Sequence, residues 1–494
     1  MRGFKDLQAN DLATFSATAS RHGQRVVNAA AAQYGYELWS ADVGQAFLRG
    51  LTFAEISRLT GEPLRQVQFD LPAGSVPLLR QLPGMGDFDP SRECLDMVRP
   101  GFGLKDAPRA WSIRLDQELT KHGLTRTQAD RCLYVMFENS KLVLIISTHV
   151  DDLKGAGTKK ATERILEILT RAFGKLKVCR GSFEHTGVQH EQDPKTYEVS
   201  TTQDHYVKQL RPMALDSLNQ VPDEQLVEES MHPAFWSLLG GASWVLVTRA
   251  DVAVYVGHLQ RNAKKPNAGH LRLLNKIVKW MKRRPCSLVY KHVPPPLRLL
   301  VLSDSAYRAA EPDCLALRAA ILAIVTDGHK LGGPLHVLDF YSRKQTLVSR
   351  STFSAELLGL ADAASSGLHL QSLLEEVFFG ARSADALVQA QTAGTMQVPL
   401  DVAVDAMAVW QAVTAEELKP PTERHMFLHV KAFRDKLDAG SIRTLWWVDT
   451  RDMLCDCLTK GGISREAVLE AWRSAQWALV GDAPRPWRAK RGSG

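Results

Sequence analysis

A short hairpin that ends in two aspartates constrains this chain more than any other feature. Residues 132–138, CLYVMFE, and 141–150, KLVLIISTHV, are apolar runs separated by Asn-Ser, a pattern that predicts a β-hairpin. Asp151 and Asp152 directly follow the second strand. Two adjacent carboxylates beside a core strand repel each other and are costly to remove from water. Either they form a polar surface turn or they bind a cation.

Length and composition point to a soluble, intracellular protein of several domains. The 494 residues are too many for one hydrophobic core, and about two to four domains are expected. The longest apolar runs are strand-sized, short of the roughly 20 residues that span a bilayer, and the first residues lack the apolar segment of a signal peptide. We therefore expect the cytoplasm or the nucleus, no secretion and no membrane partner. The net charge of +7 mildly favours polyanionic partners.

The cysteines favour a reduced protein without a disulfide framework or a zinc site. There are seven, an odd number, and they are scattered along the chain. Only Cys455 and Cys457 lie close together, and this pair lacks the second pair that a zinc site requires. Reduced thiols are typical of an intracellular protein.

The chain divides at residues 293–297, VPPPL, a stiff spacer after which the pattern of strands and helices begins again. Before the spacer, apolar spacing predicts helices over residues 107–123, 159–174 and 270–285, and residues 211–230 resemble a polar linker. After it we expect strands over 297–307, 314–327 and 335–343, a long helix over 353–377, a strand over 398–405, a helix around 421–438 and a strand over 442–449.

A third carboxylate near the N-terminus follows the pattern of the first two. Asp42 follows ELWSA, which is expected to be a strand. If this strand and the hairpin belong to one sheet, Asp42, Asp151 and Asp152 converge on one edge. Such carboxylates suit Mg²⁺, which keeps coordination sites for phosphate oxygens. Two ions about 3.5–4 Å apart can activate a 3′-hydroxyl and stabilise a leaving pyrophosphate.

Three motifs stand in order along this part of the chain: ADVGQAFLRG (41–50), GLKDAPRAW (103–111) and HVDDL (149–153). Their order and distances resemble the reverse transcriptase of copia-type retrotransposons, and further similar blocks extend the resemblance over about residues 1–465. The resemblance implies that Asp42, Asp151 and Asp152 are polymerase metal ligands. It also implies that Phe47 is the aromatic ring that lies under the incoming sugar and excludes a 2′-hydroxyl.

Four acids in the second half form another set. Asp304 in VLSDSAY, Glu356 in STFSAELLGLADAA, Asp405 in VAVDAMAV and Asp456 in DMLCDCLTKG come from different expected elements. Their motifs and the order of strands and helices resemble ribonuclease H. The resemblance implies a site that binds Mg²⁺ and hydrolyses the RNA strand of an RNA–DNA hybrid. Asp401 competes with Asp405 but fits the motif less well.

The resemblance also implies a fold and a set of partners. The fold is α/β (α+β), with a reverse transcriptase palm and partial fingers (1–175), a thumb- or connection-like region (176–295), a ribonuclease H-like domain with a mixed five-stranded sheet (296–465) and a basic, disordered tail (466–494). The cofactor is Mg²⁺, two ions per site, with Mn²⁺ as a substitute. The partners are an RNA template, a DNA primer, the RNA–DNA hybrid, deoxynucleoside triphosphates and, within a polyprotein, integrase and protease segments.

A polymerase that cannot choose a sequence binds nucleic acid largely through phosphates. Basic side chains in the matching blocks are the candidates for these contacts, although each fits a solvated helix face equally well. They are Lys105, Arg109, Lys276, Lys279, Lys282, His425 and Lys431.

The chain departs from the family pattern in three places. It begins just after the family's K-x-R-L-V-A-x-G stretch, which implies that part of the fingers is missing. Asp106 replaces a Gln beside the expected nucleotide site, where it either repels the triphosphate or serves as a helix N-cap ahead of Pro108. His149 replaces a Tyr. Two functions therefore stay open: an RNA-directed DNA polymerase with ribonuclease H activity, as a fragment or degraded copy, or a catalytically inactive nucleic-acid-binding relic.

Overall fold

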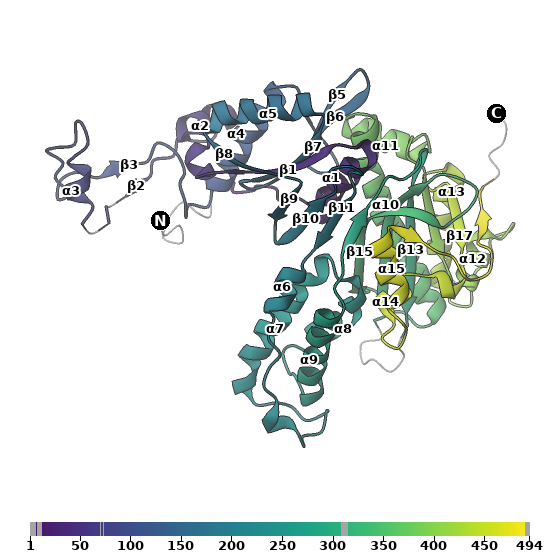
Figure 1. Ribbon diagram of the computed structural model, residues 1–494. Helices are drawn as coiled ribbons and strands as arrows, with labels where there is room; N and C mark the ends of the chain where they lie inside the picture. The colour runs from purple at the N-terminus through teal and green to yellow at the C-terminus, as the bar shows by residue number, and fades with distance from the viewer. Residues whose placement is uncertain (1–5, 7–11, 70, 73, 308–314, 490–494) are drawn as a thin grey trace.

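The computed structural model describes every residue except 1–5, 7–11, 70, 73, 308–314 and 490–494. Two sheets lie side by side, one built from the first part of the chain and one from the last, and a helical bundle extends away from them (Figure 1). A narrow arm with strands β2 (Gln68–Phe69) and β3 (Leu95–Asp96) and the short helix α3 (Val76–Leu79) projects from the first sheet.

The first sheet has the strand order β4-β5-β6-β7-β1-β8, and every neighbouring pair is antiparallel. The predicted hairpin is confirmed, because β5 pairs with β6 across Asn139 and Ser140, which both have positive φ. The bounds are β1 Glu37–Val43, β4 Thr125–Arg126, β5 Leu133–Glu138, β6 Lys141–His149, β7 Asp152–Gly157 and β8 Leu176–Arg180.

Alternation along the strands of this sheet gives it two apolar faces. Trp39 belongs to a core that includes residues of helices α4 (Ala107–Lys121) and α5 (Lys159–Phe173). The neighbouring Leu38 points the other way, into a core shared with helix α1 (Arg21–Tyr34). Both faces are therefore covered, and the sheet is held rigidly behind its carboxylate-bearing edge.

Helix α1 also joins the first sheet to the last one. The guanidinium of Arg21 donates to the Asp339 carboxylate at 2.8 Å, and that of Arg25 donates to the Leu338 carbonyl at 3.3 Å. A single hydrophobic core runs from α1 through the strands of the C-terminal sheet. The two sheets are consequently fixed relative to each other.

Residues 182–290 form a four-stranded sheet of order β12-β11-β10-β9 and a helical bundle, whereas β8 (Leu176–Arg180) belongs to the first sheet. The predicted basic helix is α9, and an apolar core fills the bundle between α7, α8 and α9. The bounds are β9 Ser182–His185, β10 Val188–Gln192, β11 Val199–Thr202, α6 Asp204–Gln209, α7 His232–Trp244, α8 Ala253–Arg261, α9 Ala268–Arg283 and β12 Leu288–Tyr290.

The C-terminal sheet has the order β18-β15-β14-β13-β16-β17-β19. Strand β14 is antiparallel to both of its neighbours, β13 and β15, while β16 runs parallel to both β13 and β17. The predicted strands and helices occur in the predicted order, but two helices that were not predicted, α11 and α12, lie among them. Strand β14 begins at Leu317, and Cys314 is outside the described residues. The bounds are β13 Leu297–Ala306, β14 Leu317–Thr326, β15 Gly333–Lys344, α10 Thr352–Phe379, α11 Ala384–Thr392, β16 Leu400–Val404, α12 Met407–Thr414, α13 Phe427–Ala439, β17 Thr444–Trp447 and α14 Asp456–Thr459.

The prediction of a disordered tail over residues 466–494 is wrong for its described part. Helix α15 spans Glu466–Ser474, β18 (Gln476–Trp477) pairs with β15, and β19 (Arg485–Trp487) pairs with β17. Trp472 and Trp477 are buried in the core, and burial of two large aromatic side chains offsets the entropy lost on ordering. The expected sheet of five strands therefore has seven. Residues 490–494 lie outside the described residues.

None of the helices in the described ranges is long and apolar enough to cross a membrane.

Candidate metal centres

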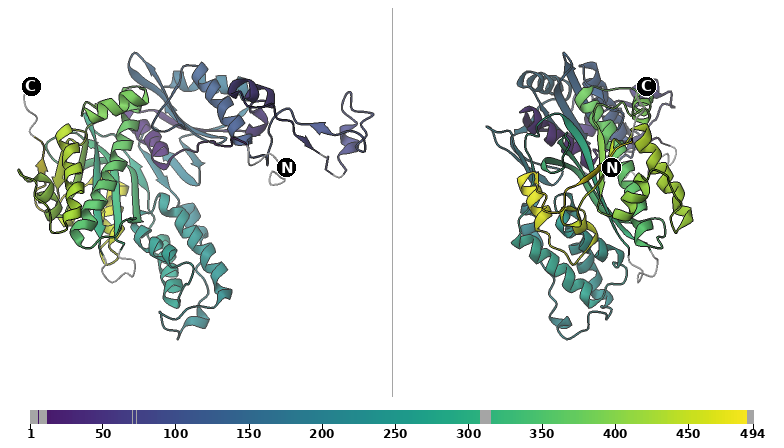
Figure 2. Two further views of the ribbon diagram at one scale, coloured as in Figure 1. Left: turned by 180° about the vertical axis from the view of Figure 1, so that it is seen from behind. Right: turned by 90° about the vertical axis from the view of Figure 1, so that its right-hand side faces the viewer.

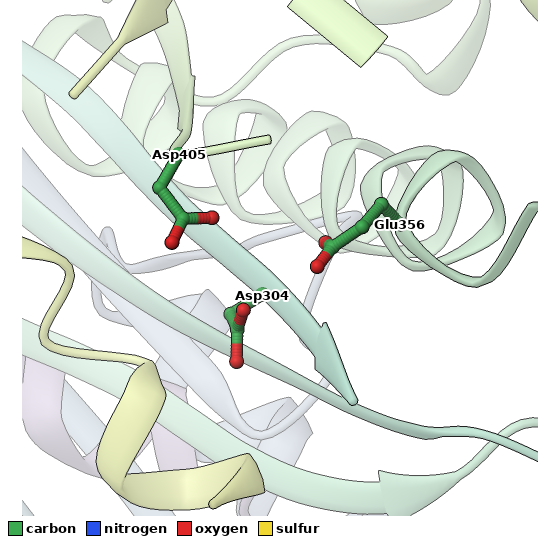
Figure 3. A group of neighbouring side chains, drawn as sticks. All are labelled: Asp304, Glu356 and Asp405. Carbon is green, nitrogen blue, oxygen red and sulfur yellow. The ribbon is translucent and has the colours of Figure 1, made fainter. Parts of the chain in front are cut away.

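Three acids of the second set meet at one edge of the C-terminal sheet. Asp304 lies near the end of β13, Asp405 directly follows β16, and Glu356 lies near the N-terminus of α10. Because β13 and β16 are parallel neighbours, their carboxyl ends reach the same edge. Oxygens of Asp304, Glu356 and Asp405 lie within 4.8 Å of one another, with the three side chains directed toward a common point (Figure 3).

Contacts at the N-terminus of helix α10 hold Glu356 in place. Ser351 caps the helix by accepting the backbone N–H of Ser354. The Glu356 carboxylate accepts the backbone N–H of Ser305 at 3.1 Å, which ties the helix to the end of β13. The acid is thus oriented by both elements.

The electrostatics of this cluster disfavour three ionised carboxylates without a cation. Burial, followed by the charges of Asp304 and Asp405, raises the pKa of Glu356 to about 10. Burial and the charge of Asp304 also raise the pKa of Asp405. Oxygen ligands at this spacing suit a hard divalent cation such as Mg²⁺ or Mn²⁺, whose charge would offset the repulsion. The residues therefore fit the metal that the sequence predicts.

The fourth acid, Asp456, lies on helix α14 beside the cluster but outside the group of three. Burial, followed by the charge of Asp304, raises its pKa to about 7. Its carboxylate Oδ1 accepts a hydrogen bond of 2.6 Å from the Lys460 ammonium. Sequence reasoning missed Lys460, although a lysine four residues after an acid on a helix is a recognisable pairing signal.

Asp401, the competitor of Asp405, has a different environment. It is fully buried, and its carboxylate pairs with Arg298 at 2.7 Å and with Arg443 at 2.9 Å. Trp446 Nε1 donates to the same oxygen at 3.2 Å. These bonds occupy the carboxylate in the interior, so Asp405 is the residue that faces the cluster.

The first set of acids lies at the edge of the N-terminal sheet. Asp42 on β1 stands opposite Asp152 on β7 in the antiparallel register. Asp151 precedes β7, and its carbonyl accepts the Val43 N–H at 3.2 Å. Burial, then the charges of Asp151 and Asp42, raise the pKa of Asp152. The predicted convergence of the three residues on one edge is observed.

This first set is looser than the second, and one detail of the prediction is wrong. Asp152 opens β7 instead of ending the hairpin, because the chain turns at Val150, which has φ 58°, and pairs back on β6 from Asp152 onward. Trp111 Nε1 donates to the Val150 carbonyl at 2.6 Å and holds this turn. In the described residues, only Asp304, Glu356 and Asp405 bring ligand atoms within 4.8 Å of one another as a group of three.

The other residues predicted near the first site are largely engaged with neighbours. Phe47, in the 3₁₀ turn Ala46–Arg49, packs on Phe102 with ring centroids 5.1 Å apart. Asp106 occupies the N-cap position of α4, but it makes no capping bond and pairs with the buried Arg65. The expectation that its side chain caps the helix is therefore wrong.

The two basic candidates near this site, Lys105 and Arg109, differ in whether an acidic side chain already pairs with them. The Arg109 guanidinium donates two bonds of 2.8 Å to the carboxylate of Glu62, so its charge is already balanced. Lys105 is exposed. Of the two, Lys105 is the better placed to meet a phosphate.

The remaining basic candidates lie on exposed helical surfaces. Lys276, Lys279 and Lys282 repeat every three residues and form an exposed row on α9. His425 is exposed in the 3₁₀ turn Arg424–Met426, and Lys431 on α13 pairs with Asp435. In Figure 2 the bundle that carries α9 extends below both sheets.

The sequence of the chain is similar to those of known transposon proteins. No protein-family model matches the chain. The retrovirus-related Pol polyproteins from the transposons RE1 and RE2 of Arabidopsis thaliana are each 22% identical to it over 475 and 480 residues, which is 93% of the chain. The chain is a homologue of transposon Pol polyproteins. The resemblance inferred from the motifs is confirmed at this level.

The match to the Pol homologues covers only a part of them. The chain spans 29% of the length of the RE1 and RE2 polyproteins. The polyprotein from transposon TNT 1-94 of Nicotiana tabacum is 22% identical over 200 residues, which is 37% of the chain and 15% of that protein. A foamy viral protease–reverse transcriptase solved with double-stranded DNA aligns with 80% of the chain and 66% of its own at 12% identity and a TM-score of 0.18, a score too low to support an argument.

Proposed function

We propose that this chain is the region of a retrotransposon Pol polyprotein that combines an RNA-directed DNA polymerase with a ribonuclease H. The observation that carries the proposal is the meeting of Asp304, Glu356 and Asp405 within 4.8 Å, with Asp456 beside them. All four stand in motifs that resemble those of ribonuclease H. A chance gathering of four motif acids from four elements is a poor alternative explanation.

The nuclease site would hold its divalent cation on Asp304, Glu356 and Asp405. An ion bound there would lower the pKa of a water molecule and offset charge on a phosphodiester. The protein's part is to keep three oxygens aimed at one point. The Ser305 N–H, on β13, donates to the Glu356 carboxylate, and Ser351 caps the helix that carries it. Thr450 donates to Asp405 Oδ2 at 2.9 Å.

The polymerase site would use Asp42, Asp151 and Asp152 as ligands for Mg²⁺ or Mn²⁺, and deoxynucleoside triphosphates as substrates. The turn after β6 and the pairing of β1 with β7 hold these carboxylates at one edge. Phe47 follows Asp42 by five residues and would limit the space at the sugar. The row Lys276, Lys279 and Lys282 would contact backbone phosphates of the template–primer.

The nuclease half is tested with the full chain on an RNA–DNA hybrid in Mg²⁺, with end-labelled RNA as the readout. We expect RNA cleavage that Asp304→Asn and Glu356→Gln each reduce at least ~100-fold, since even outer-shell partners of a metal contribute ~10–100-fold. Asp385→Asn changes an exposed acid on α11 and serves as the matched control. A folded chain that leaves the hybrid intact would contradict the nuclease assignment.

The looser geometry of the first set favours one alternative, a protein that binds nucleic acid but does not polymerise. It predicts that the chain binds the hybrid with steep salt dependence yet extends no primer on an RNA template. Under this alternative the double change Asp151→Asn and Asp152→Asn alters nothing in the extension assay. Primer extension that this double change abolishes would exclude it.

A further inference from the structure

The second acidic cluster already contains a cation of its own. The Lys460 ammonium lies 2.6 Å from Asp456 Oδ1 and 3.4 Å from Asp304 Oδ1, so it bridges two of the four acids. An exposed lysine normally has a pKa of ~10.4, which makes this ammonium positively charged at neutral pH. Its side chain is 37% exposed, while that of Asp304 is fully buried. The positively charged Lys460 ammonium therefore lies on the solvent-facing side of the acidic cluster.

Helix α14 holds Asp304 by both of its oxygens. Thr459 Oγ1 donates to Asp304 Oδ2, and Lys460 lies next to Oδ1. Asp456 and Lys460 are four residues apart, which places them on the same face of a helical turn. The Thr-Lys pair at the end of α14 thus orients the central carboxylate of the site and separates it from Asp456.

The cluster consequently has two unlike sides. On one side Asp304, Glu356 and Asp405 bring oxygens within 4.8 Å, and the Lys460 charge opposes the rise in pKa of Glu356 and Asp405 without forming an ion pair with either among the described residues. On the other side the oxygens of Asp304 and Asp456 share the Lys460 ammonium. When all four acids are ionised, as metal binding favours, they and the ammonium carry a net charge of −3, so a single divalent ion leaves −1. A second ion would make the site positive and would have to lie against the ammonium, at an unfavourable Coulomb energy.

We infer that Lys460 is the resident cation of the Asp304–Asp456 side, so that the free protein takes one divalent ion at this site, on Asp304, Glu356 and Asp405, instead of two. This inference rests on the proposed nuclease function and narrows it. It departs from the two ions per site that the family resemblance implies. Lys460 acts as a positioning residue, through Asp304 and Asp456.

The test counts bound ions and does not depend on catalysis. The full chain carries Asp42→Asn and Asp152→Asn, which remove ligands of the other candidate centre. Bound Mn²⁺ is counted by electron paramagnetic resonance and by isothermal titration calorimetry. We expect one Mn²⁺ per chain, two after Lys460→Met or Lys460→Gln, and one after Lys460→Arg, which keeps the charge. Circular dichroism checks that each variant is folded.

The outcomes separate this inference from the function on which it rests. Two ions bound to the chain with Lys460 intact would overturn the inference and leave the nuclease site standing. One ion bound to both Lys460→Met and Lys460→Gln would also overturn it, because the ammonium would then exclude nothing. No bound ion in any folded variant would remove the metal site itself, and the proposed nuclease function with it.

Discussion

Asp42 on β1 lies directly opposite Asp152 on β7, as cross-strand partners in an antiparallel pair. Like charges opposite each other destabilise a sheet, and this pair is placed where it cannot separate. Burial and the charges of Asp151 and Asp42 raise the pKa of Asp152 accordingly. The repulsion between Asp42 and Asp152 lowers the stability of the metal-free protein, and a bound cation would offset this loss.

Replacing Asp152 with asparagine should therefore stabilise the metal-free protein while it removes function. We expect the melting temperature without metal to rise by ~1–3 °C, a gain of under ~1 kcal/mol. Differential scanning fluorimetry in EDTA measures this change. Primer extension on an RNA template should be lost in the same variant, and a variant that keeps extension would argue against Asp152 as a ligand.

The stability of the metal-free protein should fall as the pH rises. The pKa of Glu356 is raised from its ordinary value of 4.5 to about 10 in the folded chain. A carboxyl with a raised folded-state pKa favours folding when protonated, so its contribution is complete below pH 4.5 and is lost progressively toward pH 10. Each pH unit in this window lowers the free energy of unfolding by up to ~1.4 kcal/mol.

This pH dependence is measured as the melting temperature from pH 6 to 9, in EDTA and in Mn²⁺. We expect a decline of ~2–4 °C per pH unit in EDTA and a much smaller one in Mn²⁺. Glu356→Gln should flatten the EDTA curve, whereas Glu416→Gln, at an exposed position, should leave it unchanged. Equal slopes for both variants would contradict the role of Glu356.

Restoring the family's glutamine at position 106 should destabilise this chain. The Arg65 side chain is 7% exposed and pairs with both Asp106 and Asp6. Removing one partner of a buried charge leaves donors unsatisfied, at a cost of ~1–3 kcal/mol, and Asp6 keeps the cost toward the lower end. Urea unfolding measures it, with Lys105→Gln at the exposed neighbouring position as the control. An unchanged midpoint would mean that the pair contributes nothing.

The lysine row on α9 should carry part of the affinity for nucleic acid. The triple change of Lys276, Lys279 and Lys282 to Gln removes three positive charges from one exposed face. We expect weaker binding to a labelled hybrid and a salt slope shallower by up to ~3, since each phosphate contact contributes ~0.9. Fluorescence anisotropy at several salt concentrations provides both values.

A charge-matched control keeps this last test specific. Changing Lys159 and Lys160 on α5 together with Lys141 on β6 to Gln removes the same charge from exposed positions on the first sheet. The slope should then change little. Equal effects of the two triple variants would point to net charge and not to the α9 face.

Local patterns predicted the elements and most of the site. The hairpin, the helices α4, α5, α9 and α10, and the order of strands after residue 296 follow from apolar periodicity, which is a property of neighbouring residues. The ordered tail was not predicted, because Trp472 and Trp477 become buried only against strands that lie far away in the sequence. The helical spacing of Val468, Leu469, Ala471 and Trp472 does predict α15, whereas the two- and three-residue strands β18 and β19 carry no local sign of their pairing.

By itself, the sequence determined which acids belong to motifs and in what order they come, because motif order is written in the chain. Only the tertiary structure decided which of them meet. It brought Asp304, Glu356 and Asp405 within 4.8 Å, left Asp42, Asp151 and Asp152 more widely spread, and buried Asp401 against Arg298. It also placed Lys460 between Asp304 and Asp456. The reason is physical: the field at a carboxylate depends on distances across strands and helices, which residue spacing does not set.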